Sequence, residues 1–142
     1  MKKILFLFFV VFLSFSSQAS HFIGGEITWE CDKDLLSPNY GKYTFYMTIY
    51  QDCDGIDFST TGYNIDVHNH PSLFSINLPF VSSVDISPTG VPGSTACYDC
   101  SSQPFGTFGA VKQWNYASAP TTITGSPSAD GWHFTWGTCC RS

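Results

Sequence analysis

The chain carries little charge, and positive charge is especially scarce. Only 12% of its 142 residues are charged, with 11 acidic side chains against 6 basic ones. Two of the basic residues, Lys2 and Lys3, belong to the leader described below, which leaves four basic residues and a net charge of −7 for the rest of the chain. Nucleic acids and anionic membranes are recognised by clustered Lys and Arg. We therefore expect neither as a partner.

The short motifs of common catalytic sites are also missing. The sequence has no Gly-x-Ser-x-Gly, no His-Glu-x-x-His and no glycine-rich phosphate loop. The candidates for acid–base chemistry are His21, His68, His70 and His133. His133 alternates with three aromatic residues in the run 132–136, so we expect it on the solvent side of a strand. No catalytic residue is predicted, and a hydrolase is the least favoured of the functions considered.

A long hydrophobic run occurs only at the amino terminus. Lys2-Lys3 precede an apolar run of ten residues, Ile4 to Leu13, and the small-residue site Ser17-Gln18-Ala19 follows it. This order is typical of a secretory signal peptide, whereas a membrane-spanning helix needs about 20 apolar residues. We predict that residues 1–19 are a cleaved signal peptide. Residues 20–142 then form one exported domain, at the cell surface or outside the cell, with no membrane insertion after cleavage.

Convincing helix patterns are absent after the leader, whereas aromatic residues make up 17% of the chain. Runs in which apolar and polar residues alternate, as in half-buried strands, recur between turn signals. They span residues 21–31, 42–52, 62–69, 72–78, 81–87, 107–118, 121–124 and 132–136, and residues 88–106 are irregular. Seven or eight short strands predict an all-β fold. We expect an antiparallel β-sandwich with disulfides, immunoglobulin-like or jelly-roll-like, with a barrel as the alternative.

The first two runs, residues 21–31 and 42–52, are joined by a polar loop and predict an antiparallel hairpin. Alternation places one set of apolar side chains on a common, core-facing side of the hairpin. This set consists of Ile23, Ile27, Trp29 and Cys31 in the first run and Tyr43, Phe45, Met47 and Ile49 in the second. The Gly24-Gly25 pair indicates a bulge or a close packing point.

Six cysteines in an exported chain predict disulfides. They are Cys31, Cys53, Cys97, Cys100, Cys139 and Cys140. Cys31 lies at the turn end of the hairpin and Cys53 lies about ten residues along its second strand, so they are roughly 30 Å apart, too far to bond. Both are therefore expected to bond to the later chain, with the neighbours Cys139 and Cys140 as natural candidates. Cys97 and Cys100 either close on each other or pair outward.

A zinc site is the alternative interpretation of the later cysteines. Cys97-x-x-Cys100 and Cys139-Cys140 would supply four thiolates, and His68, Asn69 and His70 could add nitrogen ligands. The zinc-knuckle spacing occurs only once, and an exported protein tends to oxidise its thiols, so disulfides are favoured. A thioredoxin-like role would need a helix after the Cys-x-x-Cys, and the segment around it is rich in Pro and Gly instead.

Asp52, Asp54 and Asp57 form the candidate calcium site. They lie in the turn Asp52-Cys53-Asp54-Gly55-Ile56-Asp57, whose spacing does not match an EF-hand, where Gly is sixth and Glu twelfth. A looser calcium site on a surface loop and a solvated turn both stay open. No other cofactor is expected.

Tyr46, Tyr50 and Tyr116 are the candidate ligand contacts. If exposed, as we expect, they could stack on the sugar rings of a glycan. Cross-strand packing of the same tyrosines is the competing interpretation, and it is the one we favour.

Two stretches resemble a known family. Ser20-His-Phe-Ile-Gly-Gly-Glu-Ile-Thr-Trp-Glu-Cys31, with Tyr50-Gln-Asp-Cys53 closing the next strand, resembles the amino-terminal module of large secreted surface proteins of Bacteroidota. Near the end, Ser128-Ala-Asp-Gly-Trp-His-Phe-Thr-Trp-Gly-Thr-Cys-Cys-Arg141 is similar to the family's aromatic strand and Cys-Cys-Arg-Asn segment. Gln51 stands where the family has Arg, and Ser142 where Asn is common.

The resemblance implies a non-enzymatic module that leads a long, adhesin-like protein, often labelled gliding-motility-associated. Such proteins carry repeats and a carboxy-terminal segment for type IX secretion, and because neither occurs here we expect a fragment or a truncated reading frame. The expected partner is an extracellular glycan or protein surface. The alternative function is a carbohydrate-binding module that uses surface aromatics, with or without calcium.

Overall fold

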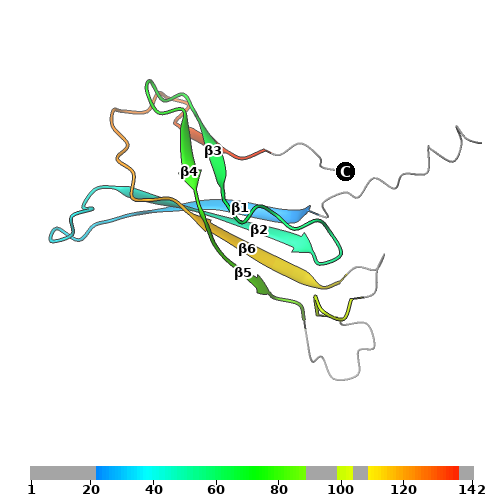
Figure 1. Cartoon of the computed structure of the whole chain (residues 1–142). Coiled ribbons are helices and arrows are strands. Elements are labelled where there is room, and N and C mark those ends of the chain that lie inside the picture. The colour runs from blue at the N-terminus through cyan, green and yellow to red at the C-terminus, as the bar shows by residue number, and fades with distance from the viewer. Residues whose placement is uncertain (1–21, 89–98, 104–108, 138–142) are drawn as a thin grey trace, which may run out of the picture.

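The computed structural model describes residues 22–88, 99–103 and 109–137. These residues form seven strands in two antiparallel sheets (Figure 1). The predicted all-β sandwich is thereby confirmed. The predicted signal peptide, residues 1–19, lies outside the described residues, and the described ones include no helix long and apolar enough to cross a membrane.

Sheet A has the strand order β1-β2-β6-β5 and sheet B the order β4-β3-β7. The strands of sheet A are β1 (Phe22–Cys31), β2 (Tyr43–Asp52), β6 (Val111–Ala117) and β5 (Phe80–Asp85). Those of sheet B are β4 (Ser75–Leu78), β3 (Tyr63–His68) and β7 (His133–Thr135). Figure 1 shows β3 and β4 crossing the strands of sheet A steeply, so sheet A extends beyond sheet B on both sides.

The core lies between the two sheets and follows the alternation of β2. Phe45, Met47 and Ile49 are at most 2% exposed, as predicted, because alternate side chains of a strand point to one face. Sheet B contributes Ile65 and Leu78, both 0% exposed. Burying each of these side chains stabilises the fold by about 1.5–3 kcal/mol.

A buried amide joins β2 to β6. Gln51 is 0% exposed, and its Oε1 accepts the indole N–H of Trp114 at 2.7 Å. The amide nitrogen of Gln51 donates to the carbonyl of Ile56 and so ties the next loop to the sheet. An arginine has no acceptor atom for an indole N–H, so glutamine fits this position where the resembled family carries Arg.

Tyr116 belongs to the core and is 1% exposed. Its hydroxyl donates to the carbonyl of Ser59 at 3.0 Å, and its ring packs edge-on against Tyr63 at 5.3 Å. Burial, and then the neighbouring Tyr63, raise the pKa of the Tyr116 phenol. The prediction that Tyr116 is an exposed ligand contact is wrong, because β6 turns Tyr116 inward on the same face as Trp114.

The predicted irregularity at the glycine pair is confirmed. The register of β1 against β2 shifts between Phe22 and Gly24, which turns Phe22 toward Trp136, with ring centroids 6.0 Å apart. Ile23 is consequently 57% exposed, so its predicted place on the core side is wrong. At Gly25 a Cβ atom would lie 2.7 Å from the backbone oxygen of Thr48, which explains the need for glycine.

Three other predicted runs are shorter or more exposed than expected. Phe74, which precedes β4, is 72% exposed. Val84 and Ile86 are 50% and 44% exposed. The register of β5 shifts between Phe80 and Ser82 and sets Val84 opposite Gln113, on the outer face of sheet A, and Ile86 follows two residues later. Residues 121–124 contribute one isolated bridge, between Thr121 and Tyr43.

Cys53 and Cys100 form a disulfide across 47 residues of sequence, with Cα atoms 5.1 Å apart. Cys31 is a free thiol. This confirms the predicted absence of a Cys31–Cys53 bond, and it shows that the predicted bond of Cys31 to the later chain is wrong. The predicted bond of Cys53 to Cys139 or Cys140 is wrong. Hydrogen bonds from Gln103 to Asp52 and from the Cys100 N–H to Asp85 hold residues 99–103 at the end of β2, next to Cys53.

The same bond rules out two other arrangements of Cys100. It does not close on Cys97, and it cannot supply a thiolate to the four-cysteine zinc site. Cys97, Cys139 and Cys140 themselves lie outside the described residues.

Replacing both Cys53 and Cys100 by serine should lower the free energy of unfolding by about 3–4 kcal/mol, because a cross-link of this span restricts the unfolded chain. Urea denaturation measures the loss. Cys31→Ser is the matched control and should cost less than about 1 kcal/mol. A double variant as stable as the wild type would contradict a stabilising role for the bond.

Gly25→Ala should destabilise the protein by about 1–3 kcal/mol, because the new methyl group overpacks against the β2 backbone. Gly24→Ala meets no atom within 4 Å and should stay within about 0.5 kcal/mol of the wild type. Thermal unfolding of the two variants gives the comparison. Equal stabilities would argue against the close approach at Gly25.

Candidate binding site

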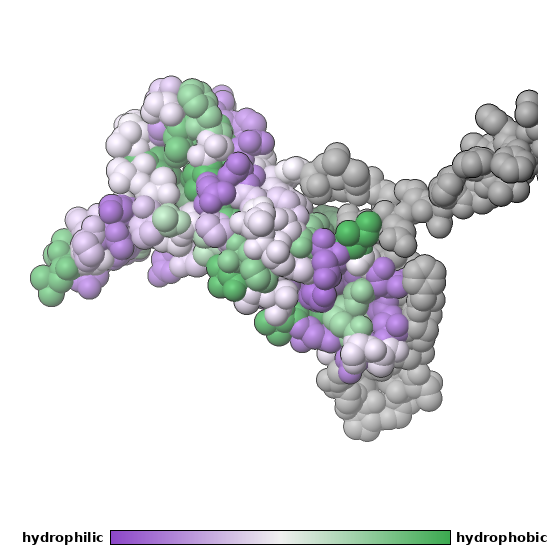
Figure 2. Space-filling view, in the orientation of Figure 1, coloured by the Kyte–Doolittle hydropathy of each residue, from purple (hydrophilic) through white to green (hydrophobic). Residues whose placement is uncertain are grey.

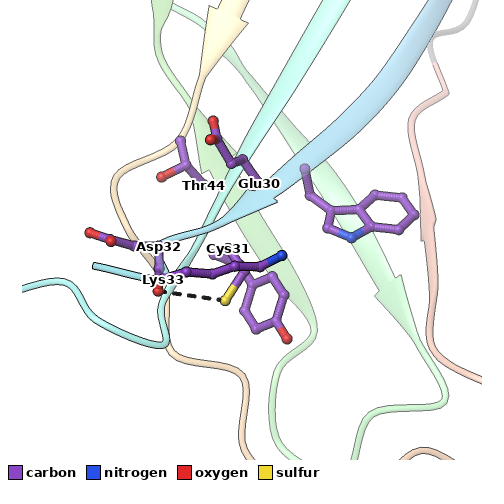
Figure 3. A pocket seen from close by; sticks show the side chains of 7 residues that line it. Glu30, Cys31, Asp32, Lys33 and Thr44 are labelled. Carbon is purple, nitrogen blue, oxygen red and sulfur yellow. Dashed lines mark hydrogen bonds between the residues drawn. The ribbon is translucent and has the colours of Figure 1, made fainter. Parts of the chain in front are cut away.

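Side chains at the loop end of the β1–β2 hairpin surround a hollow of about 660 Å³. The register places Cys31 opposite Tyr43 and Glu30 opposite Thr44. Figure 3 accordingly shows Glu30 and Thr44 on one side of the hairpin and Cys31 on the other, with Lys33 beside it. The lining residues are Trp29, Glu30, Cys31, Asp32, Lys33, Tyr43 and Thr44.

A second hollow, of about 250 Å³, adjoins the first and shares Trp29 and Tyr43 with it. Its wall includes Trp132 and Phe134, from β7 and the residue before it. The ring of Phe134 lies 4.7 Å from that of Phe45 and 6.3 Å from that of Trp29. We call the two hollows together the hairpin cleft.

Trp29 stands at the mouth of the hairpin cleft and is 60% exposed. It shares a strand face with Ile27, which packs against the core. β7 has only three residues, and it ends before it can cover the end of the hairpin. The prediction that Trp29 lies on a covered side is therefore wrong, and its indole is left open to a ligand.

Polar groups give the loop after β1 a defined shape. Asp32 accepts hydrogen bonds from the Ser37 hydroxyl and from the Asp34 backbone N–H. These bonds, that of Ser37 first, hold the pKa of Asp32 below its ordinary value, so the carboxylate stays charged. The N–H of Gly41, at a φ of +76° that favours glycine, donates to the Asp32 carbonyl at 2.8 Å and closes the loop.

His70 supports the back of the cleft. It is 7% exposed, and its ring lies 4.9 Å from that of Trp132. Nδ1 accepts the backbone N–H groups of Ser72 and Leu73 at 3.2 and 2.9 Å. Nε2 must then carry the proton, which it donates to the Thr124 carbonyl at 3.0 Å. Both nitrogens are in use, so His70 is not available to a metal.

The other predicted nitrogen ligands also have structural partners. The His68 ring is hydrogen-bonded to the hydroxyl of Thr135 in β7, and the Asn69 side chain donates to the carbonyl of Gly131. His133 is exposed, as predicted, and donates to the carbonyl of Asp130 at 2.7 Å. His21 lies outside the described residues.

Asp52 is a buried structural carboxylate rather than an open ligand. It is 3% exposed and accepts bonds from the Gln103 side chain at 2.7 Å and from the Gly109 N–H at 3.4 Å. The amide oxygen of Gln103 in turn accepts the Ala110 N–H at 2.8 Å. Asp52 thus ties residues 99–103 and the start of β6 to the end of β2.

The three predicted calcium ligands do not converge. Asp57 forms an ion pair with Lys112 at 2.8 Å. Across residues 22–88, 99–103 and 109–137, a single group of three potential ligand atoms lies within 4.8 Å: Cys53, Asp85 and Cys100. Its two sulfur atoms are bonded to each other, and Asp85 accepts the Cys100 N–H at 2.8 Å. The turn formed by residues 52–57 is therefore no calcium centre of the predicted kind.

Tyr46 and Tyr50 lie on the outer face of sheet A, away from the hairpin cleft. Tyr46 is 39% exposed, as predicted, and Tyr50 is half-buried beside Gly24 and Gln113. They form a flat polar face together with Thr48 and its neighbours, and Tyr116 is absent from it.

The hairpin cleft itself is not predicted by any sequence motif. The one available signal is that Trp29, the last large aromatic of its run, is followed almost directly by the charged residues Asp32, Lys33 and Asp34. β7, which forms part of the wall, lies more than 100 residues later in the chain, so the sequence around Trp29 could not predict its contribution.

No protein-family model, curated protein or solved structure matches the chain. The resemblance to the surface proteins of Bacteroidota therefore stays a prediction. The function of the hairpin cleft has to be inferred from its own residues.

His70→Ala should lower the free energy of unfolding by about 2–3 kcal/mol, because the buried ring is lost and two backbone N–H groups and a carbonyl lose their hydrogen-bond partner. His133→Ala, an exposed histidine in the same part of the fold, should change it by less than about 0.5 kcal/mol. Urea denaturation compares the two. Similar losses for both variants would show that His70 does not brace the cleft.

Proposed function

We propose that the chain is a non-enzymatic binding module of an exported, adhesin-like surface protein, and that its ligand occupies the hairpin cleft. The observation that carries the proposal is Trp29, which is 60% exposed at the mouth of a hollow of about 660 Å³. Large aromatic side chains set in or beside a pocket supply most of the energy of many binding sites.

Polar groups on both faces of the hairpin end could serve a ligand. Lys33 and Glu30 are exposed and form no ion pair within the described residues. The Cys31 thiol has one long contact, 3.8 Å to the carbonyl of Asp32. An aromatic wall with a few uncommitted polar groups suits an amphipathic ligand, such as part of an extracellular glycan or of a protein surface.

The lining of the cleft supports binding rather than catalysis. Among the described residues, no histidine and no serine lines either hollow. Cysteine and hydroxyl nucleophiles are usually activated by an adjacent histidine base, and the described lining of the cleft supplies none. His70, behind the wall, uses both ring nitrogens to hold the backbone.

Two features support the exported setting. The Cys53–Cys100 disulfide is typical of an oxidising compartment, and the predicted signal peptide would deliver the chain there. An adhesin-like or gliding-associated role comes from the family resemblance and is part of the proposal.

A carbohydrate-binding module that uses the outer face of sheet A is the second candidate. It is favoured by Tyr46, which is 39% exposed on a flat polar face. This candidate now depends on Tyr46 and Tyr50 alone, without Tyr116 and without calcium at residues 52–57.

Binding of the labelled chain to arrays of glycans and extracellular matrix proteins tests the proposal. We expect saturable binding to a member of the array, weakened about 30-fold or more by Trp29→Ala, since loss of an aromatic anchor costs about 2 kcal/mol or more. Tyr46→Ala is the matched control and should bind normally. Loss with Tyr46→Ala alone would favour the second candidate, and binding unaffected by Trp29→Ala would contradict the first.

A further inference from the structure

The loop that joins β1 to β2 projects beyond both sheets (Figure 1). Leu35 and Leu36, at its tip, are 76% and 94% exposed, and Tyr40 is 56% exposed. Figure 2 shows this tip as a hydrophobic patch at the far end of the hairpin. Grouped apolar side chains on a protrusion mark an interaction surface, whereas single exposed ones need no explanation. We call residues 33–42 the hairpin tip.

Backbone hydrogen bonds hold the two leucines outward. The N–H of Leu36 donates to the Asp34 carboxylate at 3.0 Å, and that of Ser37 donates to the Asp34 carbonyl at 3.0 Å. The N–H of Tyr40 donates to the Ser37 carbonyl at 3.1 Å. The loop therefore has the conformation of consecutive turns, and the exposure of Leu35 and Leu36 is built into it.

The charges of the hairpin tip differ from those of the rest of the acidic chain. Of the three lysines among the described residues, Lys33 and Lys42 lie here. Asp34 in the tip, and Glu30 and Asp32 just before it, offset them, so residues 30–42 have a net charge of −1 while the remainder is more acidic. Mutual repulsion with an anionic surface is thus weakest at this end.

The order of side chains along the hairpin matches the layers of a lipid–water interface. Leu35, Leu36 and Tyr40 lie in the loop itself, Lys33 and Lys42 flank it along the chain, and Trp29 lies further back in β1. Aliphatic side chains prefer the acyl region, whereas aromatic rings and lysines prefer the headgroup level.

We propose that the hairpin tip docks on a zwitterionic lipid bilayer, with Leu35 and Leu36 inserted between the headgroups. This shallow docking departs from the expectation, drawn from the sequence, that no part of the exported chain enters a membrane. A bilayer suits this tip better than a protein pocket does, because two leucines on a convex turn fit a deformable surface without shape complementarity. The inference does not depend on the function proposed for the hairpin cleft. Docking would, however, place the mouth of the cleft close to the membrane surface.

Co-sedimentation with phosphatidylcholine vesicles tests this proposal. The wild-type chain should bind, and the double variant Leu35→Ser/Leu36→Ser should partition about tenfold less or weaker still, since two apolar side chains are lost from the acyl region. Phe74→Ser removes an equally exposed apolar side chain, 72% exposed, from another part of the surface and should bind like the wild type. Circular dichroism checks that all three chains are folded.

Fluorescence gives a second, independent readout of the docked geometry. Emission of the wild-type chain should shift to shorter wavelength on vesicle binding and be quenched by brominated phosphatidylcholine, and Trp29→Phe should abolish most of both effects. No binding to phosphatidylcholine, or equal binding by the double leucine variant, would overturn the proposal. Binding confined to phosphatidylglycerol vesicles would overturn it too, as would self-association of the wild type that the leucine variant abolishes.

Discussion

The contact between Phe134 and Phe45 sets how far sheet B reaches along the hairpin. Their ring centroids are 4.7 Å apart, at a point where β7, three residues long, faces strands β1 and β2 of ten residues each. The covering strand ends there, so the last side chains of β1 lie beyond the core. The exposed indole of Trp29, the hairpin cleft and the projecting hairpin tip are all consequences of this difference in strand length.

The opposite end of the hairpin is held firmly. Gln51 joins β2 to Trp114, Asp52 joins it to Gln103, and Cys53 is bonded to Cys100. These three consecutive residues use an amide, a carboxylate and a disulfide to fix one end of the strand. A hairpin anchored in this way presents its other end on a rigid support, the usual arrangement for loops that bind. The stabilising contacts and the proposed binding surfaces thus lie at opposite ends of the same two strands.

Local patterns are enough to predict the strands, because the rise and alternation of a strand depend little on its neighbours. The buried face of β2 and the close packing at Gly25 follow from them, and so does the separation of Cys31 from Cys53. The burial of Tyr116 was also within reach, because Tyr116 has the same phase as Trp114 in β6. The prediction that Tyr116 is exposed did not take into account that the two residues share a face.

Other features depend on the second sheet and could not be read from the sequence. Trp29 alternates correctly with its neighbours, yet its exposure is decided by where β7 stops. The pairing of Cys53 with Cys100 depends on how residues 99–103 return to the end of β2. The cleft unites side chains from β1, β2 and β7, which no local pattern connects.

Acrylamide quenching of tryptophan fluorescence tests most directly whether the hairpin end is open in the folded protein. Trp29 is 60% exposed and Trp114 is 2% exposed, so acrylamide should quench the fluorescence of Trp29 more readily than that of Trp114. Trp29→Phe should remove the red-shifted emission that acrylamide quenches most readily, while Trp114→Phe should leave that component in place. If quenching is unchanged in Trp29→Phe, the indole is covered in solution and the hairpin cleft is closed.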